Sequence, residues 1–196
     1  MEPEENEFAY SDCLLRVRDG NAAAARELVH ALHPMVMRII HTHRPAVVAA
    51  EDIAQEVFMR VFSRLHQYQA RAPFHHWVAR IATLACLEQR RRAWVRREIS
   101  WADLTDAQQA TLQAAEPSPP TRDTPRDAAG LVRLLLDTLP PAQRLILTLL
   151  DLEERPVAEI ASLTGWSASR IKVTAWRARR RLARTATRLH LREPSP

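Results

Sequence analysis

Glycine and cysteine are scarce in this chain. Only three of its 196 residues are glycine, which argues against phosphate-binding loops and tight β-hairpins because such turns need a positive φ. The two cysteines, Cys13 and Cys86, form neither a disulfide framework nor a metal-binding pattern, which favours a reducing compartment. No apolar run approaches the ~20 residues that span a bilayer, and the acidic Met1–Ser11 segment lacks a signal-peptide profile. We therefore expect a soluble, helical, cytoplasmic protein without direct membrane insertion.

Lysine is also rare, and arginine carries most of the positive charge. The chain has 28 Lys+Arg and 23 Asp+Glu, a net charge of +5, and Lys172 is its only lysine. The excess lies mainly in residues 126–196, where 13 basic side chains accompany seven acidic ones, whereas residues 99–125 are acidic. Guanidinium groups suit phosphates and base edges, so the bias is consistent with a nucleic-acid partner, although a GC-rich genome also raises arginine content.

Prolines mark a boundary between two lobes. Four of the 13 prolines fall within residues 116–126, where they interrupt the helical pattern. The length and composition of this stretch favour an interdomain linker over a surface loop within one domain. We expect a first domain over residues 1–98, a flexible Pro-rich linker over 99–126 and a second domain over 127–196.

Apolar side chains recur at intervals of three and four residues on both sides of the linker, which is the spacing of one helix face. A kink is expected at Pro34, and no segment alternates as a strand would. The predicted fold class is therefore all-α, with two small helical domains. The pattern predicts helices over residues 22–43, 51–65, 74–97, 127–138, 140–150, 156–163 and 168–188.

Residues 156–184 have the features of a helix-turn-helix. Pro156 suits the first turn of a helix, because the N–H group that it lacks would be unpaired there. Gly165 can adopt the left-handed conformation that ends this helix, and Ser167 can cap the next one by accepting hydrogen bonds from its free amides. With the small Ala161 where the helices would cross, the pattern is typical of the DNA-binding motif.

The second helix of this motif combines an apolar face with a strongly basic one. Ile171, Ala175, Ala178 and Leu182 recur at helical spacing and should face inward. Seven Lys or Arg residues lie between positions 170 and 184 without an acid among them. A merely solvated helix usually mixes both signs, so DNA phosphates explain this face better. The candidate DNA contacts here are Ser169, Arg170, Lys172, Val173, Thr174, Arg177, Arg179 and Arg180.

The predicted helix over residues 51–65 has a polar face that includes Asp52, Gln55, Glu56 and Met59. Acids at a helix N-terminus are stabilised by the helix dipole, which accounts for Asp52. It does not account for Glu56 or Met59, and a patch of acid, amide and methionine could instead dock onto a basic partner helix. The sequence leaves both interpretations open.

An aromatic and basic segment follows, over residues 67–97. Aromatic rings that stack on unpaired bases, with cations along the backbone, are typical of single-stranded nucleic-acid binding. Phe74 and Trp77 can instead anchor the core, and for Trp77 we favour that interpretation, whereas Tyr68 and both histidines are expected to be exposed. The candidate contacts are Tyr68, Arg71, His75, His76, Arg80 and Arg91.

Two alternatives belong to other functional classes. Eight histidines raise the possibility of an enzyme, but no pair of histidines shares a helix face with a carboxylate at metal-binding spacing, so we predict no catalytic residue, metal or cofactor. A stand-alone helix-turn-helix regulator, with a first lobe that senses a ligand or dimerises, accounts for residues 156–184 but not for residues 51–97.

Residues 50–92 and 134–182 resemble regions 2 and 4 of the extracytoplasmic-function (ECF) RNA polymerase sigma factors of the sigma-70 family. The resemblance implies a region 2 bundle and a region 4 helix-turn-helix domain, which bind the clamp helices and flap of core RNA polymerase. It also implies binding to double-stranded and melted promoter DNA, control by an anti-sigma factor, and no catalytic residues.

The resemblance assigns roles to the candidate residues by motif position. Asp52, Gln55, Glu56 and Met59 would face the clamp helices of the largest subunit. The segment from Tyr68 to His76 would capture a flipped base of the −10 element, and Arg170, Thr174 and Arg177 would read the −35 element in the major groove.

Four positions depart from the family pattern. Leu84 stands where the family usually has Asn, and Glu88 where it often has Asp. Thr174 stands where Arg is common, and Trp176 where His or another polar residue is common. These departures predict an unchanged fold and a promoter preference that differs from the common one.

Overall fold

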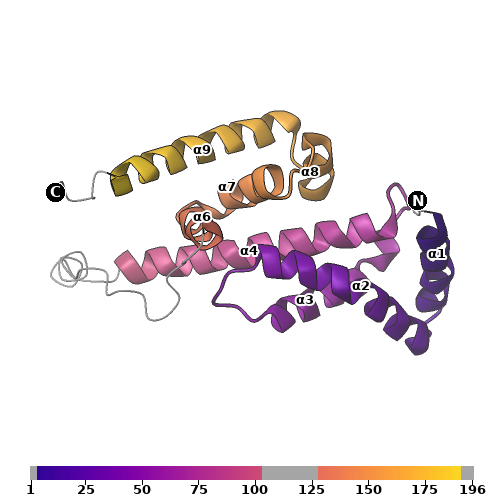
Figure 1. The fold of residues 1–196 in the computed structure, drawn as a ribbon. Coiled ribbons are helices and arrows are strands. Elements are labelled where there is room, and N and C mark those ends of the chain that lie inside the picture. Colours follow the sequence, from indigo (N-terminus) through magenta and orange to yellow (C-terminus); the bar gives the residue numbers. More distant parts are fainter. Residues whose placement is uncertain (1–3, 103–127, 191–196) are drawn as a thin grey trace. The chain divides into compact units, whose positions relative to one another are not determined.

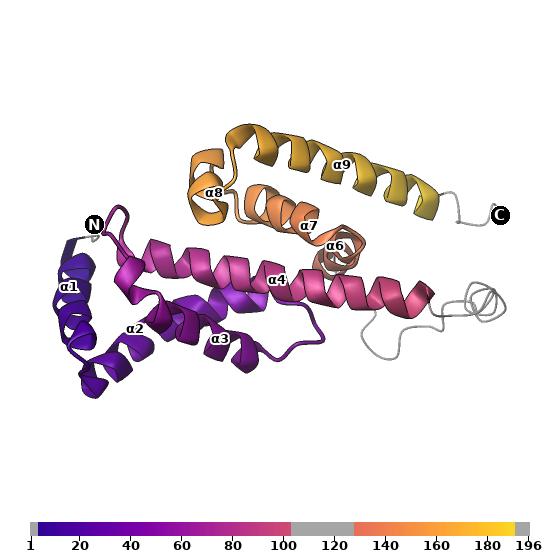
Figure 2. The same cartoon turned by 180° about the vertical axis from the view of Figure 1, so that it is seen from behind.

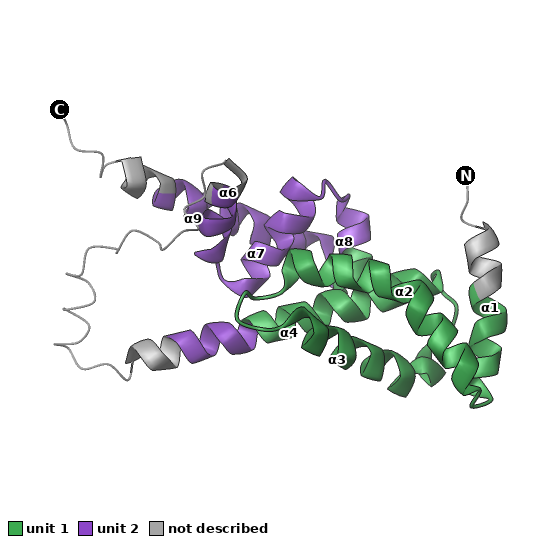
Figure 3. Ribbon diagram, turned by 60° about the horizontal axis from the view of Figure 1, so that its bottom comes forward, with its two compact units in different colours: residues 1–90, 161–165 green, residues 91–160, 166–196 purple. Residues whose placement is uncertain are grey.

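The computed structural model describes residues 4–102 and 128–190, with side chains described for 10–97, 130 and 132–185. Every regular element in these ranges is helical, which confirms the predicted all-α class (Figure 1). The described residues form two compact units, one with residues up to 90 together with 161–165, the other with 91–160 and 166 onward (Figure 3). Of the predicted linker, residues 99–102 end a helix and 103–126 lie outside the described residues, so the predicted domain limits stay a prediction.

The first unit is built on four helices. Three of them match predicted segments to within a few residues, and the first helix was not predicted. Its first two turns are rich in acids, and its buried side chains, Tyr10 and Leu14, make too short an apolar stripe to stand out in the sequence. The elements are α1 (Glu4–Arg18), α2 (Ala22–His43), α3 (Ala50–Ser63), the 3-10 helix η1 (Leu65–Gln67) and α4 (Phe74–Ala102).

One apolar core holds these helices together. α2 contacts both α1 and α3, and Figures 1 and 2 show α2 and α3 alongside the first half of α4. Phe74 is buried and Trp77 packs half-buried against the core, so both serve as anchors. The core side chains from α2, α3 and α4 include Leu28, Leu32, Val36, Ile40, Ile53, Val57, Val61, Val78, Ala82 and Ala85.

The two cysteines belong to this packing. Burial raises the pKa of the Cys86 thiol to about 12, so the thiol stays protonated and is a poor nucleophile. Cys13 is half-buried and its thiol donates to the carbonyl of Ala24 at 3.3 Å. Both residues therefore fill the core rather than form a reactive site.

Helix α2 is capped at both ends by side chains. The Asn21 side chain accepts hydrogen bonds from the amides of Ala23 and Ala24, each at 3.0 Å. The helix then continues without a break through Pro34. At its C-terminus, the Arg90 guanidinium donates to the carbonyls of His43 and Arg44. A cation at this end also suits the helix dipole, so Arg90 ties the end of α2 to α4.

The second unit has a small core of its own. The last helix, α9 (Ala168–His190), contacts both α6 (Ala128–Asp137) and α7 (Pro141–Leu147), with Ile171, Ala175 and Ala178 buried as the periodicity predicted. The predicted helix over 140–150 departs from α-helical geometry after Leu147 and finishes as a π-helical turn. The elements are α6 (Ala128–Asp137), α7 (Pro141–Leu147), η2 (Thr148–Leu152), α8 (Val157–Thr164) and α9 (Ala168–His190).

Replacement of Arg90 tests the capping of α2. We expect Arg90→Ala to lower the free energy of local opening at the end of α2 by about 2 kcal/mol, because two carbonyls lose a charged donor. Hydrogen exchange of the peptide that covers residues 39–48 measures this opening. The control is Arg92→Ala, an exposed residue of the same helix. Equal exchange in the two variants would contradict the capping role.

Candidate nucleic-acid and partner interfaces

The polar face of α3 lies on the surface of the first unit. Asp52 and Gln55 are exposed, and the Met59 residue is 65% exposed, an unusual position for a large apolar side chain. Neither Asp52 nor Gln55 forms a side-chain hydrogen bond or ion pair with the described residues. A shallow groove along this face is lined by Asp52, Gln55, Glu56, Met59, Arg60 and Ser63.

Glu56 differs from its neighbours because its carboxylate is already bonded within the unit. Arg60 donates to Glu56 Oε1 and to Glu88 Oε2, both at 2.5 Å. Gln89 donates to Glu56 Oε2 at 2.8 Å. Burial opposes the charge of Arg60, yet its bonds to Glu88 and Glu56 raise its pKa. These contacts join α3 to α4, so Glu56 holds the fold together as well as lining the groove.

The segment between η1 and α4 is folded back on its own aromatic residues. The Tyr68 hydroxyl donates to the carbonyl of Ala72 at 2.8 Å. The Tyr68 ring meets Phe74 edge-on at 5.0 Å between centroids and lies 5.6 Å from Trp77. The expected exposure of Tyr68 is therefore wrong: the residue is half-buried, because the first turn of α4 covers its ring.

The other candidate residues of this segment differ in exposure. His75 is half-buried, with its ring 6.4 Å from that of Tyr10 on α1, so its expected exposure is also wrong. His76 is exposed as expected. The candidate cations Arg71, Arg80 and Arg91 are all exposed.

The turn before α9 has the two local features predicted for a helix-turn-helix. Gly165 has a φ of +74°, which an L-residue with a side chain adopts at a cost. The amide of Arg170 donates to Ser167 Oγ at 3.3 Å, so Ser167 caps α9. Both sequence-based expectations are confirmed.

The cations of α9 fall into two groups. Arg179 donates to both carboxylate oxygens of Asp151, at 3.2 and 2.5 Å, and this bond raises its pKa. Lys172 and Arg177 are exposed and form no side-chain bond with the described residues. These two are therefore available to a ligand, whereas Arg179 is engaged with η2.

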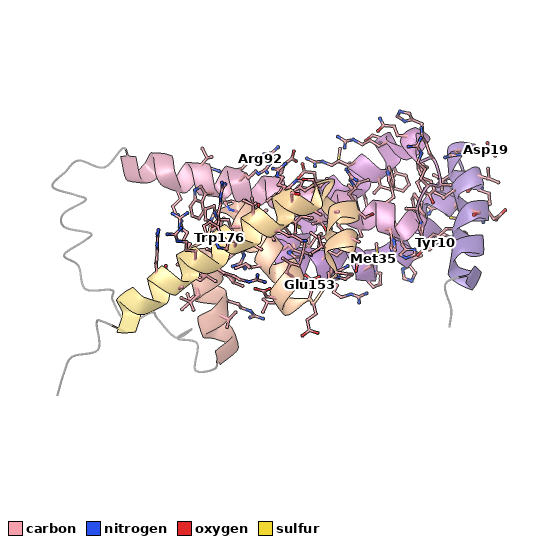
Figure 4. All side chains as sticks on the ribbon, turned by 90° about the horizontal axis from the view of Figure 1, so that it is seen from above. Tyr10, Asp19, Met35, Arg92, Glu153 and Trp176 are labelled. Carbon is pink, nitrogen blue, oxygen red and sulfur yellow. The ribbon has the colours of Figure 1, made fainter. Side chains whose placement is uncertain are left out.

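Two further arginines lie against tryptophan rings. The Arg170 guanidinium carbon lies 4.0 Å from the centroid of Trp166, and that of Arg180 lies 5.3 Å from Trp176, which is 58% exposed (Figure 4). Such stacking restricts the guanidinium while its N–H groups remain able to donate. The remaining candidates of α9 differ in burial: Ser169 and Val173 are exposed and Thr174 is half-buried.

Sequence reasoning missed the residues that hold these candidates in place. Arg60 lies four residues after Glu56, a helical pairing that could have been read from the sequence. Asp151 and Gln89 could not be found that way, because their partners lie 28 and 33 residues away.

The described residues hold neither a metal-binding group nor a membrane-spanning helix. No group of three or more His, Cys, Asp or Glu side chains there could hold a metal ion. No described helix is both long and apolar enough to cross a membrane.

Comparison with known proteins gives the family. The model of sigma-70 region 2 matches residues 28–96, and that of sigma-70 region 4 matches residues 129–182. The chain is 31% identical over 134 residues to the ECF RNA polymerase sigma factor SigE of Mycolicibacterium smegmatis, covering 68% of this chain and 50% of that protein. It is 30% identical over 173 residues to the ECF RNA polymerase sigma factor BldN of Streptomyces coelicolor, covering 86% and 62%. The chain thus spans about half the length of the curated relatives that it matches.

Solved structures agree on the fold. The sigma factor RpoE from Bartonella quintana, in a co-crystal with the anti-sigma factor NepR, has a TM-score of 0.53 at 16% identity, covering 83% of this chain and 96% of that one. CnrH, in complex with the cytosolic domain of CnrY, has a TM-score of 0.52 at 18% identity, covering 89% and 95%. The chain belongs to the sigma-70 family, as an ECF RNA polymerase sigma factor with regions 2 and 4.

The bonds of Glu56 lead to a test of stability. We expect Glu56→Ala to lower the free energy of unfolding by about 1–3 kcal/mol, because Arg60 and Gln89 each lose an acceptor. Asp52→Ala, on the same helix, should change it by less than about 0.5 kcal/mol. Urea titration of both variants measures the difference, and equal losses would argue against the structural role of Glu56.

Proposed function

We propose that this chain binds core RNA polymerase in the cytoplasm, directs it to promoters and assists melting of the −10 element. The observation that supports this most strongly is the presence of regions 2 and 4, in that order, in one chain. In this proposal, residues 1–98 bind the polymerase and the −10 element, 99–126 are a linker and 127–196 bind the −35 element and the polymerase flap. The polymerase performs the chemistry, so the chain needs no catalytic residue, metal or cofactor.

The exposed face of α3 is the proposed surface for the clamp helices of the largest subunit. Asp52 and Gln55 offer unpaired polar groups, and Met59 offers a flexible apolar side chain that can adapt to a partner surface. An apolar anchor within a polar surround is a common arrangement at an interface hot spot. Glu56 contributes negative charge to this face while it remains bonded to Arg60.

A double variant tests this surface. We expect Asp52→Lys with Met59→Ala to weaken binding of the core enzyme about ten- to hundredfold, because it reverses one charge and removes the apolar anchor. The control is Glu51→Lys, a charge reversal at the neighbouring exposed residue, which does not line the groove. Titration of labelled protein with core polymerase gives both affinities. Unchanged binding by the double variant would rule out this face.

The −10 contact is proposed for the segment from Tyr68 to His76 with the cations Arg71, Arg80 and Arg91. Extrusion of a base from a duplex costs a few kcal/mol, which capture by a prepared loop can offset. The exposed His76 offers a stacking surface, and the arginines offer contacts for the strand's phosphates.

The −35 contact is proposed for α9, with Arg177 as the base-reading residue. Ser169, Arg170, Lys172, Val173, Thr174 and Arg180 complete the proposed surface, and Arg179 supports it through Asp151. We expect Arg177→Ala to weaken binding at the cognate site by about 1–3 kcal/mol and to relax base preference there. Binding of the holoenzyme to a library of −35 sequences measures both effects.

Arg179→Ala is the control on the same helix. Because Arg179 is held by Asp151, its loss should leave the base preference unchanged. If Arg177→Ala weakens binding equally on all −35 sequences, Arg177 contacts a phosphate instead of a base.

An anti-sigma factor is the proposed regulator. The Bartonella quintana sigma factor RpoE, which shares the fold, is seen with the anti-sigma factor NepR. An inhibitor that covers the exposed face of α3 would compete with the polymerase for the same side chains.

Run-off transcription tests the function as a whole. Core polymerase with this chain should initiate at defined start sites on genomic templates, and core polymerase alone should not. A stand-alone regulator would instead bind promoters tightly without polymerase and would select no start site, and that result would overturn the proposal.

A further inference from the structure

Helix α1 contacts both ends of the segment proposed to bind the −10 element. Arg18, its last residue, donates from Nη2 to the carbonyls of Tyr68, at 3.3 Å, and Leu65, at 3.5 Å. Tyr10, in the middle of the helix (Figure 4), has its ring 5.9 Å from that of Phe74. The segment is therefore bounded by α1 at its first residue and at the start of α4.

The backbone between these two contacts has an unusual conformation. Ala70 has a φ of +54°, in the left-handed region that residues with a Cβ rarely occupy. Such a conformation persists only where the surrounding contacts enforce it. The bond from the Tyr68 hydroxyl to the Ala72 carbonyl, at 2.8 Å, closes the turn, and Arg18 holds its first carbonyl.

A cavity lies beside the segment, so the contact from Arg18 restricts where the backbone of the segment can move. A cavity of about 730 Å³ lies next to Tyr68, and Arg18 forms part of its wall together with Val17, Phe62, Leu65 and His66. Without the guanidinium group, the backbone at Tyr68 would lose its tie to α1 and would have room to move into this cavity.

We propose that Arg18 is a positioning residue for the capture of an unpaired −10 base. It acts through the backbone of Tyr68 and does not touch the DNA, and the proposal rests on the −10 role proposed above. The bonds prepare the segment before DNA arrives, so that binding does not have to order it. Helix α1 is then part of the promoter-melting machinery.

The test measures whether DNA binding still depends on the captured base when Arg18 is replaced. Holoenzyme made from the full chain and core polymerase is titrated with promoter DNA whose −10 region is already unpaired. Each non-template position is tested in turn with an intact base and with an abasic site. For the wild-type chain, loss of the captured base should weaken binding about tenfold or more, the contribution of one stacked base.

For Arg18→Ala, the same abasic site should weaken binding by no more than about twofold, because a displaced segment no longer holds the base. The control is Arg16→Ala, which lies on the same helix and pairs with Glu27 and Asp12 instead. This variant should keep the wild-type ratio of the affinities for intact and abasic DNA. Binding of core polymerase by both variants is measured in parallel.

Three results would overturn the proposal. Wild-type affinities on both intact and abasic DNA for Arg18→Ala would show that the segment is positioned without Arg18. Equal weakening on intact and abasic DNA would indicate a direct phosphate contact or a general loss of structure. If no abasic site weakens binding by the wild-type chain, the proposed base capture itself is refuted. This result is distinct from the other two, which concern Arg18 alone.

Discussion

The guanidinium group of Arg60 joins the two helices on which the first unit depends. It bonds Glu56 on its own helix, α3, and Glu88 on α4, and the far oxygen of Glu56 accepts from Gln89. Charge-assisted bonds of this kind are directional as well as strong, so they fix how α3 is rotated against α4. The exposed face of α3 and the aromatic start of α4 therefore keep a fixed orientation relative to each other. Loss of either carboxylate would leave a half-buried cation with one partner fewer, which is why this network constrains the unit more than an exposed ion pair would.

Arginine has two different uses in this chain. Arg18, Arg90 and Arg179 bond to carbonyls or carboxylates of neighbouring elements, whereas Arg177 on α9 forms no side-chain bond with the described residues. The planar guanidinium group suits both uses, because its N–H groups can donate to a backbone carbonyl, a carboxylate or a phosphate. A count of basic residues along α9 therefore overstates the number that are available to DNA. The cations that hold the fold and those that face a ligand are told apart only by tertiary contacts.

The sequence predicted what depends on local periodicity. The helices other than α1 were found to within a few residues, because each has an apolar face wide enough to dominate its segment. The Gly165 turn and the Ser167 cap were found because only a few residue types satisfy those positions. The polar face of α3 was also found, but the bonds of Glu56 were not, since Gln89 is remote in sequence. The burial of Tyr68 was missed for a different reason: it depends on a turn at Ala70 that has no glycine to mark it.

Two of the four departures from the family pattern, Thr174 and Trp176, lie on α9. Val173 and Trp176 are exposed, and Thr174, which replaces a common arginine, is half-buried. This surface therefore offers apolar groups where a polar one is common, and apolar side chains in the major groove contact the methyl group of thymine. The buried face of the same helix keeps Ile171, Ala175 and Ala178, which face the core rather than a ligand. Under the proposed −35 role of α9, a change of promoter preference can be carried by the exposed face alone, because packing of the unit depends on the opposite one.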